Sequence, residues 1–211
     1  MARPIVYGAA LSPYVWSVRL TLAEKGVAHD LVSVGISEFK SAAHLARHPF
    51  GKIPAFEHDG FMLYETQAIM RYVDEAFPAA PLQPVEVQPF ARMNQIMGVV
   101  DNYLTPCLLA HVLFQRIVAP LLGRTTDEAA VAAALPNVRH CLGEIARLAG
   151  DQPFLAGETV TLADLMAIPQ LYHFKKLPEG AAQFAELPAL SAWVDRMAAR
   201  QSVQVTCPAG M

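Results

Sequence analysis

The hydroxyl of Ser12 is a candidate catalytic group in the first part of the chain. It precedes Pro13 at the point where a short apolar run, residues 4–8, gives way to a helical pattern, which makes it a natural N-cap with proline at the first helical position. A hydroxyl at a helix N-terminus can also donate a hydrogen bond to a thiolate within a favourable dipole field. These residues alone leave both interpretations open, a plain cap and a thiolate-stabilising group.

The stretch LYETQAI places Glu65 directly before Thr66, at the predicted start of a helix. We expect Thr66 to be the N-cap, and the amides behind it can bind an anion. Glu65 could receive an ammonium group while Thr66 and the helix amides receive a carboxylate, so the pair suits the two ends of an amino acid. The alternative is that Thr66 only caps the helix and that Glu65 is a solvated acid of the first turn.

Ile53 and Pro54 stand at the beginning of the predicted strand IPAFEHD. Proline has no N–H to donate to a sheet and is confined to strand starts, edges and bulges. A cis bond before Pro54 would hold the backbone N–H and C=O of Ile53 outward. Such an exposed edge could pair with an extended peptide in the manner of an added strand.

The elements that must position these groups follow from the apolar periodicity of the first half. Asp59-Gly60 predicts a hairpin between two short strands, and Gly26 predicts a helix stop. The expected elements, in the order βαβαββα, are residues 4–8, 12–26, 30–36, 41–51, 53–59, 61–65 and 66–77. A mixed sheet with helices on both faces would satisfy this order.

The second half of the chain has a different organisation. Residues 78–89 contain four prolines and predict a linker. Helical segments then fit residues 90–115, 127–149, 162–172 and 190–199, and Thr161 with Asp164 forms a capping-box variant. We expect an α/β domain over residues 1–79, a proline-rich linker over 80–89 and an all-helical domain over 90–211.

Composition limits the classes of function. The 211 residues are 54% hydrophobic and 17% charged, and Asp101, Asn102, His111, Gln115 and Arg116 interrupt the most apolar region, so no membrane helix is predicted. The N-terminal MARPIVYG contains no secretory signal pattern, which favours the cytoplasm. The net charge of -3 without a basic block argues against nucleic acid. Three widely spaced cysteines and the lack of an HExxH motif predict reduced thiols and no metal site.

Taken together, these stretches resemble the cytosolic glutathione transferases, with a thioredoxin-like N-terminal domain and a helical C-terminal domain. The resemblance covers essentially the whole chain. YGAALSPYVWSVRLTLAEKGV and FKSAAHLARHPFGKIPAF are similar to segments of the serine-using classes, especially phi. ETQAI resembles the family motif Glu-Ser-x-Ala-Ile with Thr66 in place of serine, and FLAGETVTLADL resembles the family's capping-box segment.

The resemblance implies a role for each matched position. Ser12 would stabilise the glutathione thiolate, and Ile53, held out by a cis Pro54, would pair with the cysteinyl part of the tripeptide. Glu65 and Thr66 would hold the γ-glutamyl group. Lys40 and Lys52 would lie near the glycyl carboxylate, which needs a cation. Glutathione would be the co-substrate, no metal would be needed, and a homodimer is implied because the family's glutathione sites border the subunit interface.

Three positions depart from the phi pattern: Phe39, Lys52 and His48 stand where histidine, glutamine and asparagine are usual. Tyr7 lies where other classes have a catalytic tyrosine, but with Ser12 present we expect it to be packed. For the hydrophobic electrophile only a region is indicated, between the first loop and the long helices. The candidate electrophile-binding residues are Tyr14, Tyr103, Cys107, His111 and Phe114.

Three functions remain open at this level. The first is a glutathione transferase that conjugates the thiolate to hydrophobic electrophiles. The second is a related glutathione-dependent enzyme, a peroxidase, dehalogenase or ether-cleaving enzyme, that uses the same thiolate. The third is a non-catalytic protein that binds glutathione or apolar ligands.

Overall fold

The computed structural model describes residues 2–208, which form two compact units. The first unit holds the described residues of Met1–Gln83 and Arg200–Met211, and the second is Pro84–Ala199. The division therefore falls inside the expected linker. The expected helical domain ran to residue 211, whereas residues 200–208 pack with the first unit, because the Trp16 indole N–H donates to Thr206 Oγ1 at 2.8 Å.

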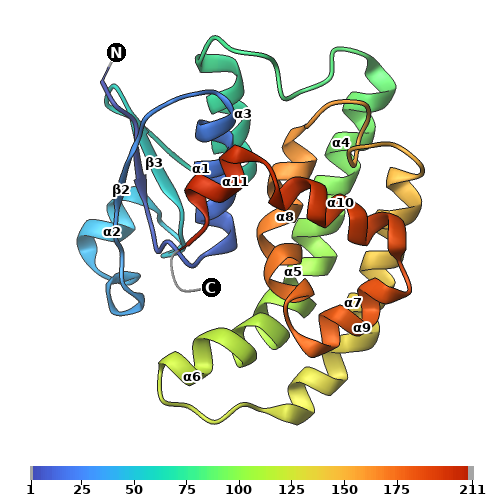
Figure 1. The fold of residues 1–211 in the computed structure, drawn as a ribbon. Coiled ribbons are helices and arrows are strands. Elements are labelled where there is room, and N and C mark those ends of the chain that lie inside the picture. Colours follow the sequence, from blue (N-terminus) through green and yellow to red (C-terminus); the bar gives the residue numbers. More distant parts are fainter. Residues whose placement is uncertain (1, 209–211) are drawn as a thin grey trace. The chain divides into compact units, whose positions relative to one another are not determined.

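The first unit is built on a four-stranded mixed sheet in the order β2-β1-β3-β4 (Figure 1). β1 pairs with β2 in parallel and with β3 antiparallel, and β3 pairs antiparallel with β4. Helices α1 and α3 pack against each other, and α11 packs on α1. The elements are β1 (Ile5–Tyr7), α1 (Pro13–Glu24), β2 (Asp30–Val32), the 3₁₀ turn η1 (Ile36–Glu38), α2 (Ala42–Arg47), β3 (Ala55–His58), β4 (Phe61–Tyr64), α3 (Thr66–Ala76) and α11 (Gln201–Thr206). The expected βαβαββα order is confirmed.

Local chemistry explains most of these boundaries. Ser12 Oγ accepts from Val15 N and begins α1, and Gly26 at φ +66° follows its end, as a left-handed glycine does after a helix. Asp59 and Gly60 both have positive φ, which suits the two-residue turn between β3 and β4. The expected strand over residues 30–36 is shorter than predicted, since the chain leaves the sheet after Val32 and winds into η1.

The second unit is helical throughout its regular structure. It begins with one continuous helical stretch, Val87–Leu121, in which two segments are wound as π-helix (Figure 1). The segments are α4 (Val87–Val99), η2 (Val100–Leu104), α5 (Thr105–Cys107), η3 (Leu108–Val118), α6 (Ala119–Leu121), α7 (Glu128–Ala149), α8 (Leu162–Lys175), α9 (Pro178–Ala185) and α10 (Pro188–Ala198). Helices α7 and α8 pack against the long stretch, and α9 and α10 pack on α8. Every residue of 161–171 is buried, so α8 is the central helix of this unit.

The stretch Val87–Leu121 is long and apolar enough to cross a membrane by length and composition alone, with a mean hydropathy of 1.4 over its most apolar window. No such helix was predicted from the sequence. One candidate span is weak evidence for a membrane, because a core helix of a globular unit passes the same test. Met93, Ile96, Met97 and Leu104 of this stretch are fully buried, while 33% of its most apolar window is buried inside the structure.

Candidate active site

The register of the sheet brings the three predicted ligand-binding segments to one end of the first unit. Tyr7, the last residue of β1, pairs with Ala55, the first residue of β3, and Ala55 pairs with Tyr64, the last residue of β4. The segments that follow Tyr7, precede Ala55 and follow Tyr64 must therefore lie beside one another. They are the Ser12 loop, the Ile53-Pro54 pair and the Glu65-Thr66 pair.

Gly8 holds the first two of these segments close together. A Cβ at this position would clash with Val15 Cγ2 and stand 3.3 Å from Ile53 Cβ, so only glycine fits without a shift of its neighbours. Ser12 is half-buried beyond this contact and accepts from Val15 N at 3.4 Å. Because a hydroxyl accepts and donates through different atoms, the Ser12 proton stays available to a ligand while the oxygen caps α1.

The Ile53-Pro54 peptide bond is cis, as the sequence analysis expected. The preceding loop is held from α2, where the buried His44 ring lies with Nε2 2.8 Å from the carbonyl oxygen of Lys52. Lys40 reaches the same loop, since a Cβ at Gly51 would stand 3.1 Å from Lys40 Nζ. Lys40 and Lys52 are both exposed, so two cations border this end of the unit.

The start of α3 corrects one prediction. Thr66 is not the N-cap: Glu65 occupies the cap position with φ +70°, and Thr66 is the buried first residue of the helix. The reason is that the chain turns sharply after β4 and uses a left-handed residue to do so. Glu65 is exposed and makes no side-chain capping hydrogen bond among residues 2–208. A helix cannot satisfy its own first-turn amides internally. In α3 the side chain of the cap residue accepts no hydrogen bond from these amides.

Tyr7 is packed. Its hydroxyl donates to Glu57 Oε2 at 2.7 Å, and the Arg47 guanidinium carbon lies 4.4 Å from the ring centroid. Burial, followed by the neighbouring Glu57 carboxylate, raises the pKa of the Tyr7 phenol. A phenol engaged in this way is a poorer partner for a thiolate than the free proton of Ser12.

The α2 histidines also border the candidate site, which was not predicted from the sequence. His44 and His48 lie one turn apart, and His48 packs on Tyr64 with a ring-centroid distance of 4.9 Å, directly before Glu65. Burial lowers the pKa of His48, and the nearby Glu65 carboxylate opposes that effect. The spacing HLARH was the available signal, although the same spacing also serves metal sites. Within the described residues no three His, Cys, Asp or Glu side chains gather in a metal-binding group.

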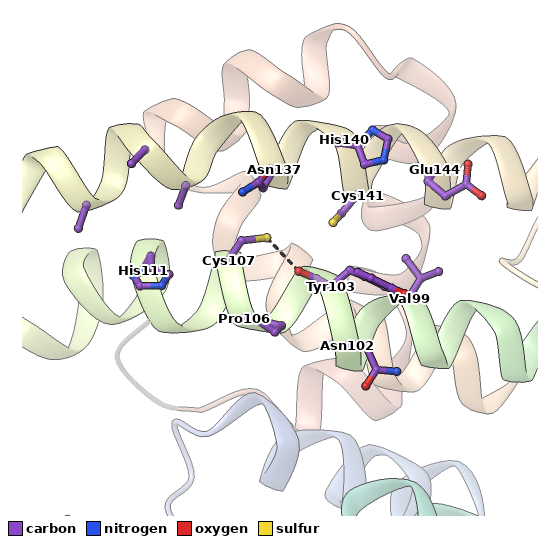
Figure 2. Close-up of a pocket in the computed structure, with 13 residues that line it drawn as sticks. Val99, Asn102, Tyr103, Pro106, Cys107, His111, Asn137, His140, Cys141 and Glu144 are labelled. Atoms are coloured by element: carbon purple, nitrogen blue, oxygen red, sulfur yellow. Dashed lines mark hydrogen bonds between the residues drawn. The ribbon is translucent and has the colours of Figure 1, made fainter.

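The candidate electrophile-binding residues do not form one group. Tyr103, Cys107 and His111 line a groove of about 790 Å³ in the second unit, between the long helical stretch and α7 (Figure 2). Phe114 is half-buried on η3 and does not line this groove. Tyr14 belongs to the first unit, where it is half-buried on α1.

Comparisons with known proteins agree with this geometry. Residues 6–81 match the family described as Glutathione S-transferase, N-terminal domain, and residues 128–196 match Glutathione S-transferase, C-terminal domain. Glutathione S-transferase 4 of Zea mays is 32% identical over 204 residues, covering 95% of this chain and 91% of the relative. Glutathione S-transferase F13 of Arabidopsis thaliana is 31% identical over 208 residues, covering 96% of this chain and 94% of the relative.

Solved structures give the same result. The apo form of glutathione S-transferase III superposes with a TM-score of 0.87 at 31% identity, over 99% of this chain and 97% of that one. Glutathione S-transferase I from maize, solved with an atrazine glutathione conjugate, has a TM-score of 0.85 at 28% identity, over 97% of this chain and 96% of that one. The thioredoxin-like and helical domains expected from the sequence are therefore confirmed, and the chain belongs to the glutathione S-transferase family.

Proposed function

We propose that this protein conjugates glutathione to hydrophobic electrophiles and that Ser12 stabilises the attacking thiolate. The observation that carries the proposal is the convergence of the Ser12 loop, the Ile53-Pro54 pair and the Glu65-Thr66 pair at one end of the sheet. In the reaction the glutathione sulfur forms a bond to an electrophilic carbon. The leaving group departs with its electron pair, or an activated alkene takes up the pair and a proton.

The tripeptide would be bound by complementary charges and by the strand edge. Glu65 would accept from the γ-glutamyl ammonium group, and Thr66 with the first amides of α3 would donate to the adjacent carboxylate. The backbone of Ile53, set by the cis bond to Pro54, would pair with the cysteinyl residue. Lys40 and Lys52 would neutralise the glycyl carboxylate. The two lysines would thus attract anionic glutathione locally, although the net charge of the protein is -3.

The energetic demand on Ser12 is moderate. Lowering a thiol pKa by about two units takes roughly 2.7 kcal/mol of preferential interaction with the anion. A hydrogen bond to a charged group contributes about 1.5–3 kcal/mol. A helix N-terminus adds about 0.3–1 kcal/mol. The free Ser12 proton at the start of α1 is therefore enough to populate the thiolate near neutral pH.

The remaining expectations belong to the same proposal. For the electrophile, the candidates that line one groove are Tyr103, Cys107 and His111. The protein would act as a cytoplasmic homodimer without membrane or nucleic-acid partners.

The proposal is tested by titrating the ultraviolet thiolate absorbance of bound glutathione in the wild type, Ser12→Ala and Ser41→Ala. Ser41 is the matched control because it also caps a helix through its hydroxyl, accepting from His44 N at 3.2 Å. We expect a thiol pKa well below that of free glutathione in the wild type and in Ser41→Ala, and a normal value in Ser12→Ala. Bound glutathione with an unshifted thiol in the wild type would reject thiolate activation and favour the non-catalytic binding protein.

A further inference from the structure

The buried histidine of α2, His44, is not among the residues proposed to touch glutathione, yet it contacts the segment that would bind the cysteinyl residue. The residue is 1% exposed, and its Nε2 lies 2.8 Å from the Lys52 carbonyl oxygen. Its Nδ1 is buried and has no hydrogen-bond partner among the described residues. Because a carbonyl oxygen can only accept, we assign the ring proton to Nε2, which donates to Lys52.

Neighbouring rings hold His44 in this orientation. Its ring centroid lies 6.0 Å from that of Phe39 and 6.4 Å from that of His48, whose plane is inclined by 28° to its own. His48 in turn packs on Tyr64 with a centroid distance of 4.9 Å. A side chain packed in this way has little freedom to change rotamer, so the Nε2–H is a donor fixed in advance.

The peptide group that His44 holds also carries the N–H of Ile53. The C=O of Lys52 and the N–H of Ile53 belong to one planar unit. This peptide bond is trans, since the cis bond of the loop is the next one, between Ile53 and Pro54. In a trans peptide the C=O and the N–H point in opposite directions. A Lys52 carbonyl held towards His44 therefore points the Ile53 N–H away from it.

The Ile53 N–H lies outside the hydrogen-bonded ladder of the sheet. The register of β3 begins at Ala55, which pairs with Tyr7 and Tyr64, so Ile53 precedes the first paired residue. The Ile53 side chain is nevertheless anchored, because it packs against the core cluster that contains Tyr7 and Ala55. With this side chain in the core and the preceding carbonyl on His44, the direction of the N–H is fixed from both sides.

We propose that His44 is a positioning residue for glutathione: its Nε2–H fixes the Lys52-Ile53 peptide so that the Ile53 N–H meets the cysteinyl carbonyl oxygen. This inference rests on the proposed function and adds a residue that does not itself touch the tripeptide. Ordering a loop when a ligand binds costs conformational entropy, and a donor that is already oriented avoids that cost. His44 would therefore raise the affinity for glutathione through the backbone.

Two matched pairs of substitutions test the Nε2 donor. His44→Gln places an amide NH₂ near the position of Nε2, whereas His44→Asn is one methylene shorter and does not reach the Lys52 oxygen. His44→Phe keeps a ring and removes the donor. His58→Phe is its control, because His58 is also buried, lies at the other end of β3 from Ala55, and has Nδ1 2.9 Å from the Tyr72 hydroxyl.

Calorimetric titration with glutathione gives the affinity, and urea denaturation gives the stability of each variant. We expect glutathione to bind about tenfold more weakly to His44→Phe and His44→Asn. Binding to His44→Gln and His58→Phe should stay within about twofold of the wild type. His58→Phe should lose stability without losing affinity, which a purely structural role of His44 would not reproduce.

A shorter ligand separates the backbone of Lys52 from its side chain. γ-Glutamylcysteine lacks the glycyl residue proposed to meet the Lys52 ammonium group but keeps a cysteinyl carbonyl oxygen. We expect His44→Phe to weaken its binding by the same factor as that of glutathione. A loss confined to glutathione would assign the effect to the Lys52 ammonium group and overturn the proposal.

Three further results would overturn it: equal affinity of the wild type and His44→Phe, no recovery in folded His44→Gln, or an equal loss in His58→Phe. If His44→Phe does not fold, the comparison of His44→Gln with His44→Asn decides. A wild type that does not bind glutathione would overturn this proposal together with the proposed function. Glutathione bound with an unshifted thiol would reject the conjugation alone, and the His44 variants would still give their answer.

Discussion

Helices α3 and α8 both begin beside an acidic side chain, and the two starts are built in opposite ways. At α8, Asp164 is fully buried, and its carboxylate accepts from Leu155 N, Thr161 N, Thr161 Oγ1 and the Trp193 indole at 2.8–2.9 Å. At α3, Glu65 is exposed, has φ +70° and makes no capping hydrogen bond within the described chain. The first acid is saturated by the protein itself, whereas the second is left available to a ligand.

The surroundings of the two carboxylates therefore differ in the way expected of a structural acid, Asp164, and of the acid proposed to bind glutathione, Glu65. Burial raises the pKa of Asp164, while its four donors favour the ionised form, so the group is tied to the fold around it. Glu65 contributes little packing and is held in a backbone conformation that non-glycine residues rarely adopt. Strain at an unsatisfied helix start is typical of a position selected for function.

The largest effect on stability is expected from substitution of Asp164, whose carboxylate is fully hydrogen-bonded. Asp164→Ala removes one carboxylate and leaves four buried donors without an acceptor, so we expect the free energy of unfolding to fall by about 3–5 kcal/mol. Urea denaturation measures this loss. Asp127→Ala is the matched control, because Asp127 caps α7 from an exposed position by accepting from Ala130 N. It should cost only about 1 kcal/mol, and equal losses in the two variants would contradict the comparison.

His173, near the C-terminal end of α8, should make the stability of the protein depend on pH. Burial, followed by the nearby Lys176, lowers the pKa of His173 to about 4 from 6.5. The folded protein therefore keeps His173 neutral where the unfolded chain binds a proton. Stability is complete above pH 6.5 and falls as pH drops towards 4, by up to about 3 kcal/mol.

Urea midpoints between pH 4 and 8 measure this loss. In His173→Gln the slope over that range should become shallower. His140→Gln, a substitution at an exposed histidine of the same unit, should leave it unchanged. A wild-type slope retained in His173→Gln would assign the acid sensitivity to other groups.

Local signals in the sequence predicted the parts of the fold that local chemistry decides. Ser12 and Gly26 bounded α1, Asp59-Gly60 gave the hairpin, and Thr161 with Asp164 gave the capping box that the structure contains. Ser12, Pro54 and the Glu65-Thr66 pair were proposed from the same kind of signal, because caps, turns and prolines mark the ends of strands. Lys40 and Lys52 were proposed from the family resemblance alone.

The elements that were missed depend on contacts between distant residues. The helix α11 has six residues, too few for a periodic pattern, and is held by Trp16 and by the ion pair of Arg200 with Glu24. Helix α9 begins at Pro178 and contains Gly180, where a Cβ would clash with the Phe174 carbonyl oxygen. No helix was predicted there, whereas the proline begins a helix and the glycine allows a close approach to α8.

Substitution of the exposed Glu65 should weaken glutathione binding more than it changes the stability of the fold. Glu65→Gln keeps the shape and removes the charge that would hold the γ-glutamyl ammonium group, so we expect glutathione to bind about tenfold to a hundredfold more weakly. The free energy of unfolding should change by less than about 0.5 kcal/mol. Calorimetric titration with glutathione and urea denaturation give the two numbers. Glu75→Gln, near the exposed C-terminal end of α3, is the control and should change neither. A Glu65→Gln protein with normal affinity would make Glu65 a solvated acid.

The smallest change in stability is expected for Glu65→Gly, and this change should be an increase. It tests the backbone conformation at the start of α3. Glu65→Gly removes the cost of a left-handed non-glycine residue, roughly 1–2 kcal/mol, and part of that gain is offset by the greater freedom of glycine in the unfolded chain. We expect the free energy of unfolding to rise by about 0.5–1 kcal/mol while glutathione affinity falls as in Glu65→Gln. Ala68→Gly, in the same first turn but with helical backbone, should instead lose about 1 kcal/mol. Higher stability together with weaker glutathione binding in Glu65→Gly would show that the backbone conformation at Glu65 is kept for binding. Lower stability in Glu65→Gly would show that the Glu65 side chain supports the fold.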